Sequence, residues 1–330
     1  MTSSAAAGAA HPPGRSPLVR VVVVTYFPGD TLSGFLASLR TATTAAYEVV
    51  LADNGSTDGA PEAAAAGDPA VRLVRTGGNI GYGRAANVGA DAARTPWLLV
   101  ANPDITFTSG ALDRMLAAAE AWPRGGAFGP AIRTADGSLY PSARSLPSLR
   151  RGVGHALAGW WWPGNPWTAA YRRERGRPVE GPVGWLSGSC LLLRRAAWES
   201  VGGFDPAYFM YFEDTDLGDR LGRRGWQSVY VPSAVVTHAG GHATARARDP
   251  MVRAHHVSAY RYLARRYPGG RWAALRAALA GGLAGRYALS RAFPGVGEGA
   301  APTRPATLLD PAPPANPAPR VDAIPIRSEG

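Results

Sequence analysis

The sequence predicts an α/β protein with a mostly parallel central sheet whose faces are covered by helices. Short apolar runs alternate with segments of helical spacing along the first half of the chain, and each run ends in a loop of polar residues and glycine. Trp97 to Ala101 is typical. This apolar run closes with Asn102-Pro103-Asp104, as expected of a buried strand that enters a loop.

The predicted elements follow one another through short loops. Leu18 to Val24 is rich in β-branched valine and predicts the first strand. Further strands are expected at Tyr47–Ala52, Val71–Arg75 and Trp97–Ala101. Helices are expected at Thr31–Leu39 (with Asp30 or Thr31 as N-cap), in the alanine-rich stretch after Gly59, and at Arg84–Ala93. Right-handed crossovers place the strand-to-helix loops at one edge of the sheet, where such folds bind ligands.

The loops at this edge offer groups that suit a nucleotide. Thr25 supplies a hydroxyl, Tyr26 an aromatic face, and Asp53, followed by Asn54, a carboxylate for a base N–H or a ribose hydroxyl. Glycines in the loop 77–83 allow backbone N–H groups to approach phosphate. A dinucleotide fingerprint would follow the first strand rather than the third, which disfavours NAD. An ordinary Asx turn is the alternative for Asp53 and Asn54.

The second half of the chain adds strands and an acidic cluster. We expect a helix at Ala111–Trp122 and strands at Gly125–Ile132, within Val183–Arg195 and within Gln227–Val236. Glu213, Asp214 and Asp216 follow an aromatic run and lead into a helix expected at Leu217–Arg224. Capping explains one or two acids at a helix N-terminus. Three acids beside four aromatic residues favour a general base.

A histidine near the end of the last strand raises the question of a metal. His238 and Asp104 together suit a divalent cation, while a loop histidine without a ligand role fits the same sequence. A zinc protease is disfavoured, because Gly240-Gly241 interrupts any helix after His238 and no HExxH motif is present.

The net charge of +11 favours anionic partners. All 35 basic residues are arginine, so the charge reflects either a compositional bias or attraction to nucleotide, lipid diphosphate or an anionic membrane surface. Nucleic acid is disfavoured, since no nucleic-acid-binding motif is present. The segment 150–177 combines Trp160, Trp161, Trp162 and Trp167 with arginines. It suits a membrane interface, a lid over an amphipathic substrate, or a surface loop folded on its own aromatic residues.

Composition also indicates compartment and organisation. Cys190 is the single cysteine, which excludes an internal disulfide and favours a reducing compartment. No signal peptide and no run of about 18 apolar residues is present. We expect disorder at 1–17 and 294–330, a globular domain at 18–245, and a basic amphipathic helical region at 246–293 that lies on a membrane or packs on its own domain.

Several motifs resemble those of inverting glycosyltransferases of the GT-A fold, family 2. They are TYFPGD, ADNGSTDG, GGNIGYGRAAN, ANPDI, GWLSGSCLLLRR and FDPAYFMYFEDTDLGDR, with a late Thr-His pair. Three segments particularly resemble actinobacterial members that transfer L-rhamnose to polyprenyl-diphospho-N-acetylglucosamine in cell-wall linker (arabinogalactan–peptidoglycan) synthesis. They are YPSAR (Tyr140–Arg144), NPWTAAYR (Asn165–Arg172) and YFMYFEDTDLGDR (Tyr208–Arg220). The resemblance covers Val19 to Tyr267.

The resemblance implies a role for each matching residue. The nucleoside would be held by Thr25, Tyr26, Asp53 and Asn54, and the diphosphate and sugar lined by Asn79, Gly81 and Asn87. Asn102 and Asp104 stand at the family's DxD position, with Asn in place of the first Asp. A divalent metal, Mg²⁺ or Mn²⁺, would be bound by Asp104 and His238. Asp214 would be the catalytic base, with the acceptor site formed by Trp185, Gly188, Glu213 and Asp216.

The resemblance also implies partners. The donor would be dTDP-L-rhamnose, bound by the nucleotide-sugar half at 18–110, and the acceptor a polyprenyl (decaprenyl) diphosphate-linked N-acetylglucosamine bound by the acceptor half at 111–245. The protein would act as a peripheral protein at the cytoplasmic face of the cell membrane.

Three alternatives are open at this point. The same chemistry with another donor, such as a galactofuranosyl or other rhamnosyl transferase, differs only in pocket shape. A nucleotidyltransferase would carry a glycine-rich loop with a basic residue after the first strand, and TYFPGD lacks it. A non-catalytic sugar-nucleotide binder is disfavoured by the presence of Asp104, Asp214 and His238.

Overall fold

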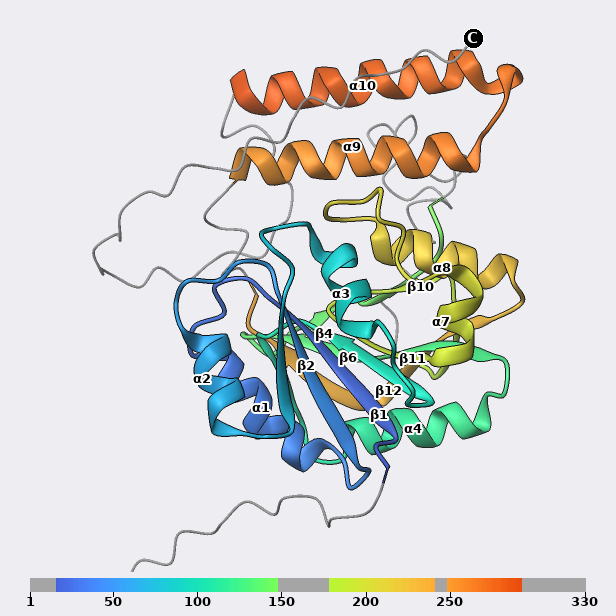
Figure 1. Cartoon of the computed structure of the whole chain (residues 1–330). Coiled ribbons are helices and arrows are strands. Elements are labelled where there is room, and N and C mark those ends of the chain that lie inside the picture. Colours follow the sequence, from blue (N-terminus) through green and yellow to red (C-terminus); the bar gives the residue numbers. More distant parts are fainter. Residues whose placement is uncertain (1–15, 148–177, 241–247, 293–330) are drawn as a thin grey trace, which may run out of the picture.

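The structure, a computed structural model, describes residues 16–147, 178–240 and 248–292 (Figure 1). Its strands are β1 Val19–Thr25, β2 Tyr47–Asp53, β3 Val71–Arg75, β4 Trp97–Ala101, β5 Ile105–Phe107, β6 Gly125–Thr134, β7 Leu139–Tyr140, β8 Ala143–Arg144, β9 Gly181–Val183, β10 Trp185–Leu186, β11 Cys190–Arg194 and β12 Gln227–His238. Its helices are α1 Thr31–Ala42, α2 Ala60–Gly67, α3 Tyr82–Ala90, α4 Ala111–Ala121, α7 Arg195–Val201, α8 Glu213–Arg223, α9 Arg248–Arg266, the 3₁₀ turn η1 Gly270–Trp272 and α10 Ala273–Ala292.

A single large sheet organises the described part of the chain. Its strand order is β3-β2-β1-β4-β11-β6-β12-β5, with β7 added beside β6 and β9 beside β12. The strands β3, β2, β1 and β4 run parallel, and β6 and β12 run parallel to each other. Strand β11 is antiparallel to both β4 and β6 and joins the two halves. The predicted α/β class with a mostly parallel central sheet is confirmed.

Two apolar layers sandwich the sheet. Every residue of β1 is buried, since valines such as Val21 and Val22 alternate between the two faces and both faces are covered. One layer packs the sheet against α1 and α4, with Phe35 and Met115 at its centre. The other packs it against α3, α7 and α8 (Figure 1). In this layer the Phe204 ring contacts Tyr82 of α3 and Trp198 of α7. The carboxyl ends of β1, β2 and β4 therefore open beside α3 and α8.

Two helix starts and one predicted cap differ from the sequence prediction. Helix α3 begins at Tyr82 rather than Arg84, directly after Gly81, whose φ of 94° ends the preceding loop. Helix α8 begins at Glu213, so the three acids lie inside its first turn instead of before it. Asp30 precedes α1, but its side chain makes no capping hydrogen bond.

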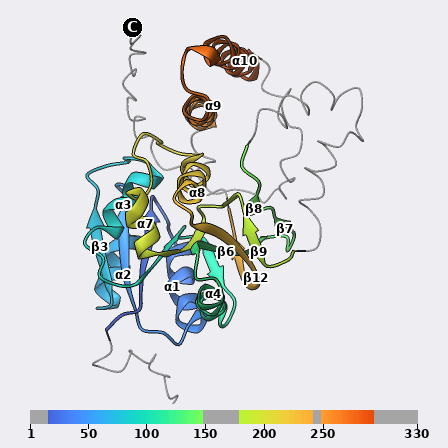
Figure 2. The same ribbon diagram turned by 90° about the vertical axis from the view of Figure 1, so that its right-hand side faces the viewer.

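The helices α9 and α10 form a pair on the α8 side of the sheet. Figures 1 and 2 show them side by side, with α9 between α10 and the rest of the protein. Ser258 of α9 donates to the Met210 carbonyl at 2.9 Å, and Arg266 pairs with Asp219 of α8 at 2.9 Å. The break between the helices falls at Tyr267-Pro268-Gly269, where proline and a glycine with φ of 85° stop α9.

Some predictions concern residues outside the described ranges. These are the tryptophan-rich segment, the NPWTAAYR motif and the terminal segments. Among the described helices, none combines the length and apolar character that crossing a membrane requires.

Candidate active site

The ends of β1 and β2 are joined through a buried carboxylate. The Thr25 hydroxyl donates to Asp53 Oδ1 at 2.8 Å, and Asp53 is fully buried. Its other oxygen accepts the backbone N–H groups of Gly55 and Ser56 at 3.1 and 3.0 Å, and the Ser56 hydroxyl donates to Oδ1 at 2.5 Å. The first two strand-to-helix loops are thus held at a fixed separation.

Arg75, at the end of β3, completes the shell around Asp53. Its Nη1 lies 2.9 Å from Asp53 Oδ2, and its Nη2 pairs with Glu62 of α2. Because a carboxylate offers about four lone-pair sites, these donors already saturate Asp53. A nucleoside would reach this carboxylate by replacing one of them, for which the rotatable Ser56 hydroxyl is best placed.

The loop after β1 presents aromatic side chains at the same edge. Tyr26 and Phe27 stack edge to face with ring centroids 4.8 Å apart. Phe27 has a left-handed φ of 48°, and its N–H donates to the Ser56 hydroxyl at 2.9 Å. This unusual backbone conformation is therefore held by the β2 loop that carries Asp53.

The third loop is closed by asparagine side chains. Asn54 accepts from the Thr76 hydroxyl at 3.0 Å and donates to the Gly81 carbonyl at 3.4 Å. Asn79 accepts the Gly81 N–H at 3.2 Å. These bonds fix the glycine-rich loop between Asp53 and the start of α3.

Tyr82, the first residue of α3, connects this loop to two segments far along the chain. Its N–H donates to the Phe209 carbonyl at 3.0 Å, and its hydroxyl donates to the Gly188 carbonyl at 2.6 Å. Burial and the charge of Glu213 raise the pKa of Tyr82 well above its ordinary value, so this hydroxyl remains a donor. One turn later, Asn87 binds the backbone N–H and carbonyl of Phe204 with both ends of its amide.

Asp104 and His238 lie together at the ends of β4 and β12. Asp104 Oδ1 is 3.0 Å from His238 Nε2, and Oδ2 accepts the Gly240 N–H at 3.1 Å. Asn102 Nδ2 lies 3.3 Å from the same histidine nitrogen. Burial acts to raise the pKa of Asp104, but the hydrogen bond and charge of His238, with backbone N–H groups, hold it below its ordinary value.

This arrangement fits part of a divalent-metal site. No group of three or more His, Cys, Asp or Glu side chains suited to a metal occurs in the described ranges. Asp104 and His238 offer two ligands close enough to contact one ion. Mg²⁺ is commonly held by one or two carboxylates together with substrate phosphates, so a donor diphosphate is the natural source of the remaining ligands.

Asp214 lies in the first turn of α8. Its Oδ2 accepts the Gly188 N–H at 2.9 Å, and its Oδ1 accepts the Thr215 N–H at 2.7 Å. Burial raises the pKa of Asp214 above its ordinary value, although these N–H groups and the nearby Arg144 guanidinium act in the opposite direction. A carboxylate with a raised pKa is suited to accept a proton.

Glu213, beside it, is a buried acid. Its Oε2 is shielded from solvent and makes no hydrogen bond with any described residue. Burial and the adjacent charge of Asp214 raise the pKa of Glu213, which favours the neutral form. The two adjacent acids thus differ in their surroundings: Asp214 accepts two backbone N–H groups, whereas Glu213 Oε2 accepts no hydrogen bond from a described residue.

The remaining predicted acceptor residues divide into two groups. Trp185 packs on Gly218 of α8, and its indole N–H donates to the Ser145 carbonyl at 3.2 Å, so it borders the segment that holds Asp214. Asp216 pairs with Arg220 at 2.5 Å and lies 3.9 Å from Arg265 of α9. Its charge is used in the contact between α8 and α9.

The structure therefore brings most predicted residues to one edge and shows others to which the sequence analysis had assigned no role. Tyr82, Ser56 and Arg75 link the loops, and Arg144 approaches Asp214. Only their positions in the sequence could have indicated these residues, because Tyr82 follows a glycine-rich loop and Arg75 ends a strand. Their partners, however, lie in distant segments that sequence spacing does not reveal.

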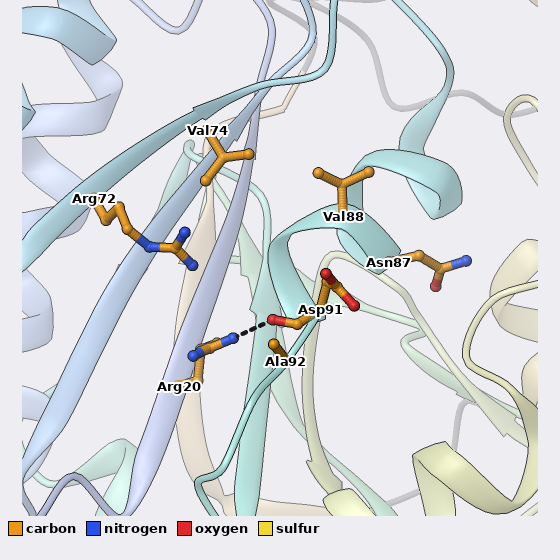
Figure 3. Close-up of a pocket in the computed structure, with 7 residues that line it drawn as sticks. All are labelled: Arg20, Arg72, Val74, Asn87, Val88, Asp91 and Ala92. Atoms are coloured by element: carbon orange, nitrogen blue, oxygen red, sulfur yellow. Dashed lines mark hydrogen bonds between the residues drawn. The ribbon is translucent and has the colours of Figure 1, made fainter.

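A separate pocket lies at the other end of the parallel strands. It has a volume of about 480 Å³ and is lined by Arg20, Arg72, Val74, Asn87, Val88, Asp91 and Ala92 (Figure 3). Arg20 in its wall donates to the Asp91 carbonyl at 2.7 Å and pairs with Glu48 at 2.6 Å. Since Arg20 and Arg72 stand near the starts of β1 and β3, the pocket is distinct from the Asp104–Asp214 region.

The fold and this edge together define a GT-A glycosyltransferase, an enzyme that transfers a sugar from a nucleotide donor. The chain belongs to glycosyl transferase family 2, whose model matches residues 20–202. A second model, glycosyl transferase family group 2, matches residues 172–301.

Individual relatives agree with this assignment. The chain is 56% identical over 275 residues to the N-acetylglucosaminyl-diphospho-decaprenol L-rhamnosyltransferase of Mycobacterium tuberculosis, covering 80% of this chain and 90% of the relative. It is 40% identical over 84 residues to rhamnosyltransferase WbbL of Escherichia coli, covering 26% and 32%. Among solved structures, the mannosyltransferase PcManGT of Pyrobaculum calidifontis, in complex with GDP-Man and Mn²⁺, matches with a TM-score of 0.53 and 18% identity over 86% and 78% of the two chains, which supports the fold alone.

Proposed function

We propose that this enzyme transfers L-rhamnose from dTDP-L-rhamnose to a polyprenyl-diphospho-N-acetylglucosamine, with inversion at the anomeric carbon. The observation that carries this proposal is the 56% identity to the mycobacterial rhamnosyltransferase across 90% of that relative's length. The E. coli relative, which is also a rhamnosyltransferase, supports the donor sugar independently of the acceptor.

The reaction is a single displacement. An acceptor hydroxyl oxygen attacks the anomeric carbon of the donor as the bond from that carbon to the diphosphate oxygen breaks. The electron pair of the broken bond leaves with the nucleoside diphosphate, and the proton of the attacking hydroxyl passes to Asp214. Gly188 and Thr215 N–H groups hold the Asp214 carboxylate at 2.9 and 2.7 Å in position for this transfer.

The donor would occupy the edge formed by the first four loops. Thr25, Tyr26 and the Asp53 loop would surround the nucleoside, and the N–H groups of the loop 77–81 would face the diphosphate. Asp104 and His238 would hold a divalent metal, Mg²⁺ or Mn²⁺, which neutralises charge on the leaving diphosphate when bound. The 3.0 Å separation of their ligand atoms supports this role.

The acceptor implies a place of action. A polyprenyl chain resides in a membrane, so we propose peripheral association with the membrane surface. Arginine-rich α9 and α10, which lie on the same side of the sheet as α8, support such contact (Figure 1).

Donor turnover tests the proposal directly. The purified chain is supplied with Mg²⁺, polyprenyl-diphospho-N-acetylglucosamine and, in parallel, dTDP-rhamnose, UDP-galactofuranose and UDP-glucose. Transfer from dTDP-rhamnose alone is expected. Transfer from another donor would contradict the donor assignment, and no transfer from any donor would contradict the acceptor.

Asp214→Asn tests the base in the same assay. General-base catalysis contributes about 10²–10⁴-fold, so the variant should lose turnover by that factor. Binding of dTDP, measured by calorimetry, should be unchanged, because Asp214 bonds Gly188 and Thr215 and not the loops that would surround the nucleoside. Turnover within a few-fold of the unaltered enzyme would remove Asp214 from this role.

A further inference from the structure

Arg144 is a fixed cation in a motif that the proposed mechanism does not use. It lies on β8, opposite Trp185 of β10. Its guanidinium carbon is 5.7 Å from the Tyr140 ring centroid and 5.6 Å from that of Trp185. Its Nε donates to the Pro141 carbonyl at 2.7 Å. One backbone acceptor and two aromatic rings therefore hold the guanidinium in place.

The outer nitrogens of this guanidinium are available to a ligand. Arg144 is partly exposed, and within the described ranges no acidic side chain pairs with it and neither Nη atom makes a hydrogen bond. An arginine held by its Nε with both Nη groups free presents two parallel donors. This geometry matches two oxygens of a phosphate.

Arg144 also lies on the acceptor side of the base. The Ser187 N–H donates to the Ser142 carbonyl at 2.7 Å, which ties the YPSAR segment to the loop whose Gly188 N–H holds Asp214. At its other end the same loop accepts the Asn102 N–H at Ser189, beside the Asp104–His238 pair. Along this loop, Ser187 contacts the YPSAR segment, Gly188 contacts Asp214 and Ser189 contacts Asn102, so the Arg144 segment joins the loop at the end away from the proposed metal ligands.

The strand β7, whose Tyr140 ring contacts Arg144, carries exposed apolar side chains. Leu139 and Tyr140 of β7 are 44% and 37% exposed and are among the few exposed large hydrophobic side chains in the described ranges. A cation next to exposed apolar side chains suits an amphiphile that carries a phosphate headgroup on a hydrocarbon chain.

We propose that Arg144 binds the diphosphate of the lipid-linked acceptor, with the exposed Tyr140 ring beside the first units of its hydrocarbon chain. This inference rests on the proposed function, which supplies the acceptor class. An acceptor sugar with one hydroxyl at Asp214 carries its diphosphate on the anomeric carbon, across the ring. A cation beyond the base, on the side away from the donor, is where that diphosphate fits.

Two acceptors separate this role from others. One is polyprenyl-diphospho-N-acetylglucosamine, and the other is an alkyl glycoside of N-acetylglucosamine without phosphate. Arg144→Gln should raise the KM for the diphosphate acceptor roughly 10- to 100-fold, the effect of losing a charged hydrogen-bond pair. The KM for the donor and the KM for the alkyl glycoside should be unchanged. Because the Arg144 charge lowers the pKa of Asp214, any change in kcat should be the same with both acceptors. Arg144→Lys retains the charge but loses the paired donors. Its KM for the diphosphate acceptor should lie between the values of the unaltered enzyme and of Arg144→Gln.

Three outcomes would overturn the proposal: an unchanged KM for the diphosphate acceptor, an equal rise in the KM for the alkyl glycoside, or a parallel rise in donor KM. Arg114→Gln is the matched control. Arg114 also donates to a backbone carbonyl, that of Ser109 at 2.7 Å, but it lies on α4 on the opposite face of the sheet. It should leave both KM values unchanged.

A binding measurement tests Arg144 without turnover. Farnesyl diphosphate is titrated into the full chain by calorimetry with Mg²⁺ and saturating dTDP, which fills the donor site. The unaltered chain should bind it at least about tenfold more tightly than Arg144→Gln. Equal affinities would refute the Arg144 proposal. Because this titration needs no rhamnose transfer, its result is distinguishable from a failure of the proposed reaction.

Discussion

Glu213 gives the clearest pH dependence at the scale of single residues. The unfolded chain loses this proton near a pKa of about 4.3, whereas burial and Asp214 raise the pKa in the folded protein. Between these two pKa values the folded state binds more protons than the unfolded state, so stability falls as pH rises through that window. Glu213→Gln, which keeps the neutral shape, should therefore raise the melting temperature at pH 8 and have no such effect at pH 4.

Thermal melts at several pH values measure this effect. About 1 kcal/mol corresponds to ~2–4 °C in a domain of 150–250 residues, so a shift of a few degrees is readily seen. A gain of equal size at pH 4 and pH 8 would show that the substitution acts through packing or hydrogen bonding rather than through the proton.

Tyr82 is a positioning residue for the proposed base. Tyr82→Phe removes the 2.6 Å hydrogen bond to the Gly188 carbonyl and frees the peptide whose N–H supports Asp214. Weaker support of the carboxylate raises the pKa of Asp214, so the acidic limb of the kcat profile should move to higher pH. At neutral pH kcat should fall about 2- to 10-fold, the effect of one neutral hydrogen bond.

Nucleotide binding and a second tyrosine provide the controls. The affinity for dTDP should be unchanged in Tyr82→Phe, since the lost hydroxyl bonds only the Gly188 segment. Tyr230→Phe makes the same chemical change in a buried tyrosine of β12 and should leave the pH profile as it is. If dTDP affinity falls while the pH profile stays fixed, Tyr82 serves the donor loop and not the base.

At the scale of elements, the contact between the start of α3 and the loop before α8 depends on a glycine. Gly81 has a φ of 94°, and a Cβ there would lie 2.3 Å from the Phe209 carbonyl oxygen. Gly81→Ala must therefore separate the two segments that Tyr82 joins. We expect a loss of about 1–3 kcal/mol in the free energy of unfolding, and a fall in kcat, because the loop leads directly to Asp214.

Gly34→Ala in α1 is the matched control. Gly34 is exposed in a helix, and a Cβ there would meet no atom within 4 Å. Alanine at this position should stabilise the protein by about 0.5–1 kcal/mol without altering kcat. Denaturant unfolding and turnover are measured for both variants. A Gly81→Ala enzyme as stable and active as the unaltered one would refute the role of the contact between α3 and the loop before α8.

The start of α8 shows what the sequence could and could not predict. The acids at its start were visible as a cluster, because three carboxylates exceed what capping requires. The sequence did not show that these acids have different hydrogen-bond partners. Asp214 is held by Gly188, 26 positions earlier, and Asp216 by Arg220 within the same helix, so only the fold separates the two. The helix was expected from Leu217 but begins at Glu213. The two residues before it, Tyr211 and Phe212, both have a left-handed φ near 65°, a backbone conformation that aromatic residues rarely adopt and that the sequence therefore did not predict.

For the whole molecule, periodicity predicted the parallel half of the sheet and the edge that carries Thr25, Asp53, Asn54, Asp104 and His238. Each of these residues follows an apolar run or closes one, so its position in the chain predicts that it lies at the end of a strand. The second half was less predictable. Strand β11 enters between β4 and β6 with antiparallel pairing, and the YPSAR segment reaches Asp214 through β8 and β10. Such pairings depend on tertiary contacts that leave no local pattern.

The distribution of charge over the whole molecule predicts that the surface formed by α9 and α10 binds anionic membranes. Between Met251 and Ala292 the chain has eight arginines and no Asp or Glu, and α9 and α10 lie on the α8 side of the sheet. The full chain should sediment with vesicles of phosphatidylglycerol and not with phosphatidylcholine. About 1 M salt should release it, because the Debye length then falls to about 3 Å.

Charge reversal locates the contact surface. Arg253→Glu with Arg271→Glu, both exposed on the helical pair, should abolish sedimentation with anionic vesicles, whereas Arg40→Glu with Arg114→Glu on the opposite face should not. Equal loss from both pairs would indicate a response to net charge alone, and retained binding in the first pair would exclude the helices as the contact. Binding through α9 and α10 would turn the α8 side, with Asp214 and Arg144, toward the lipid surface, from which a polyprenyl diphosphate headgroup reaches the base without leaving its membrane.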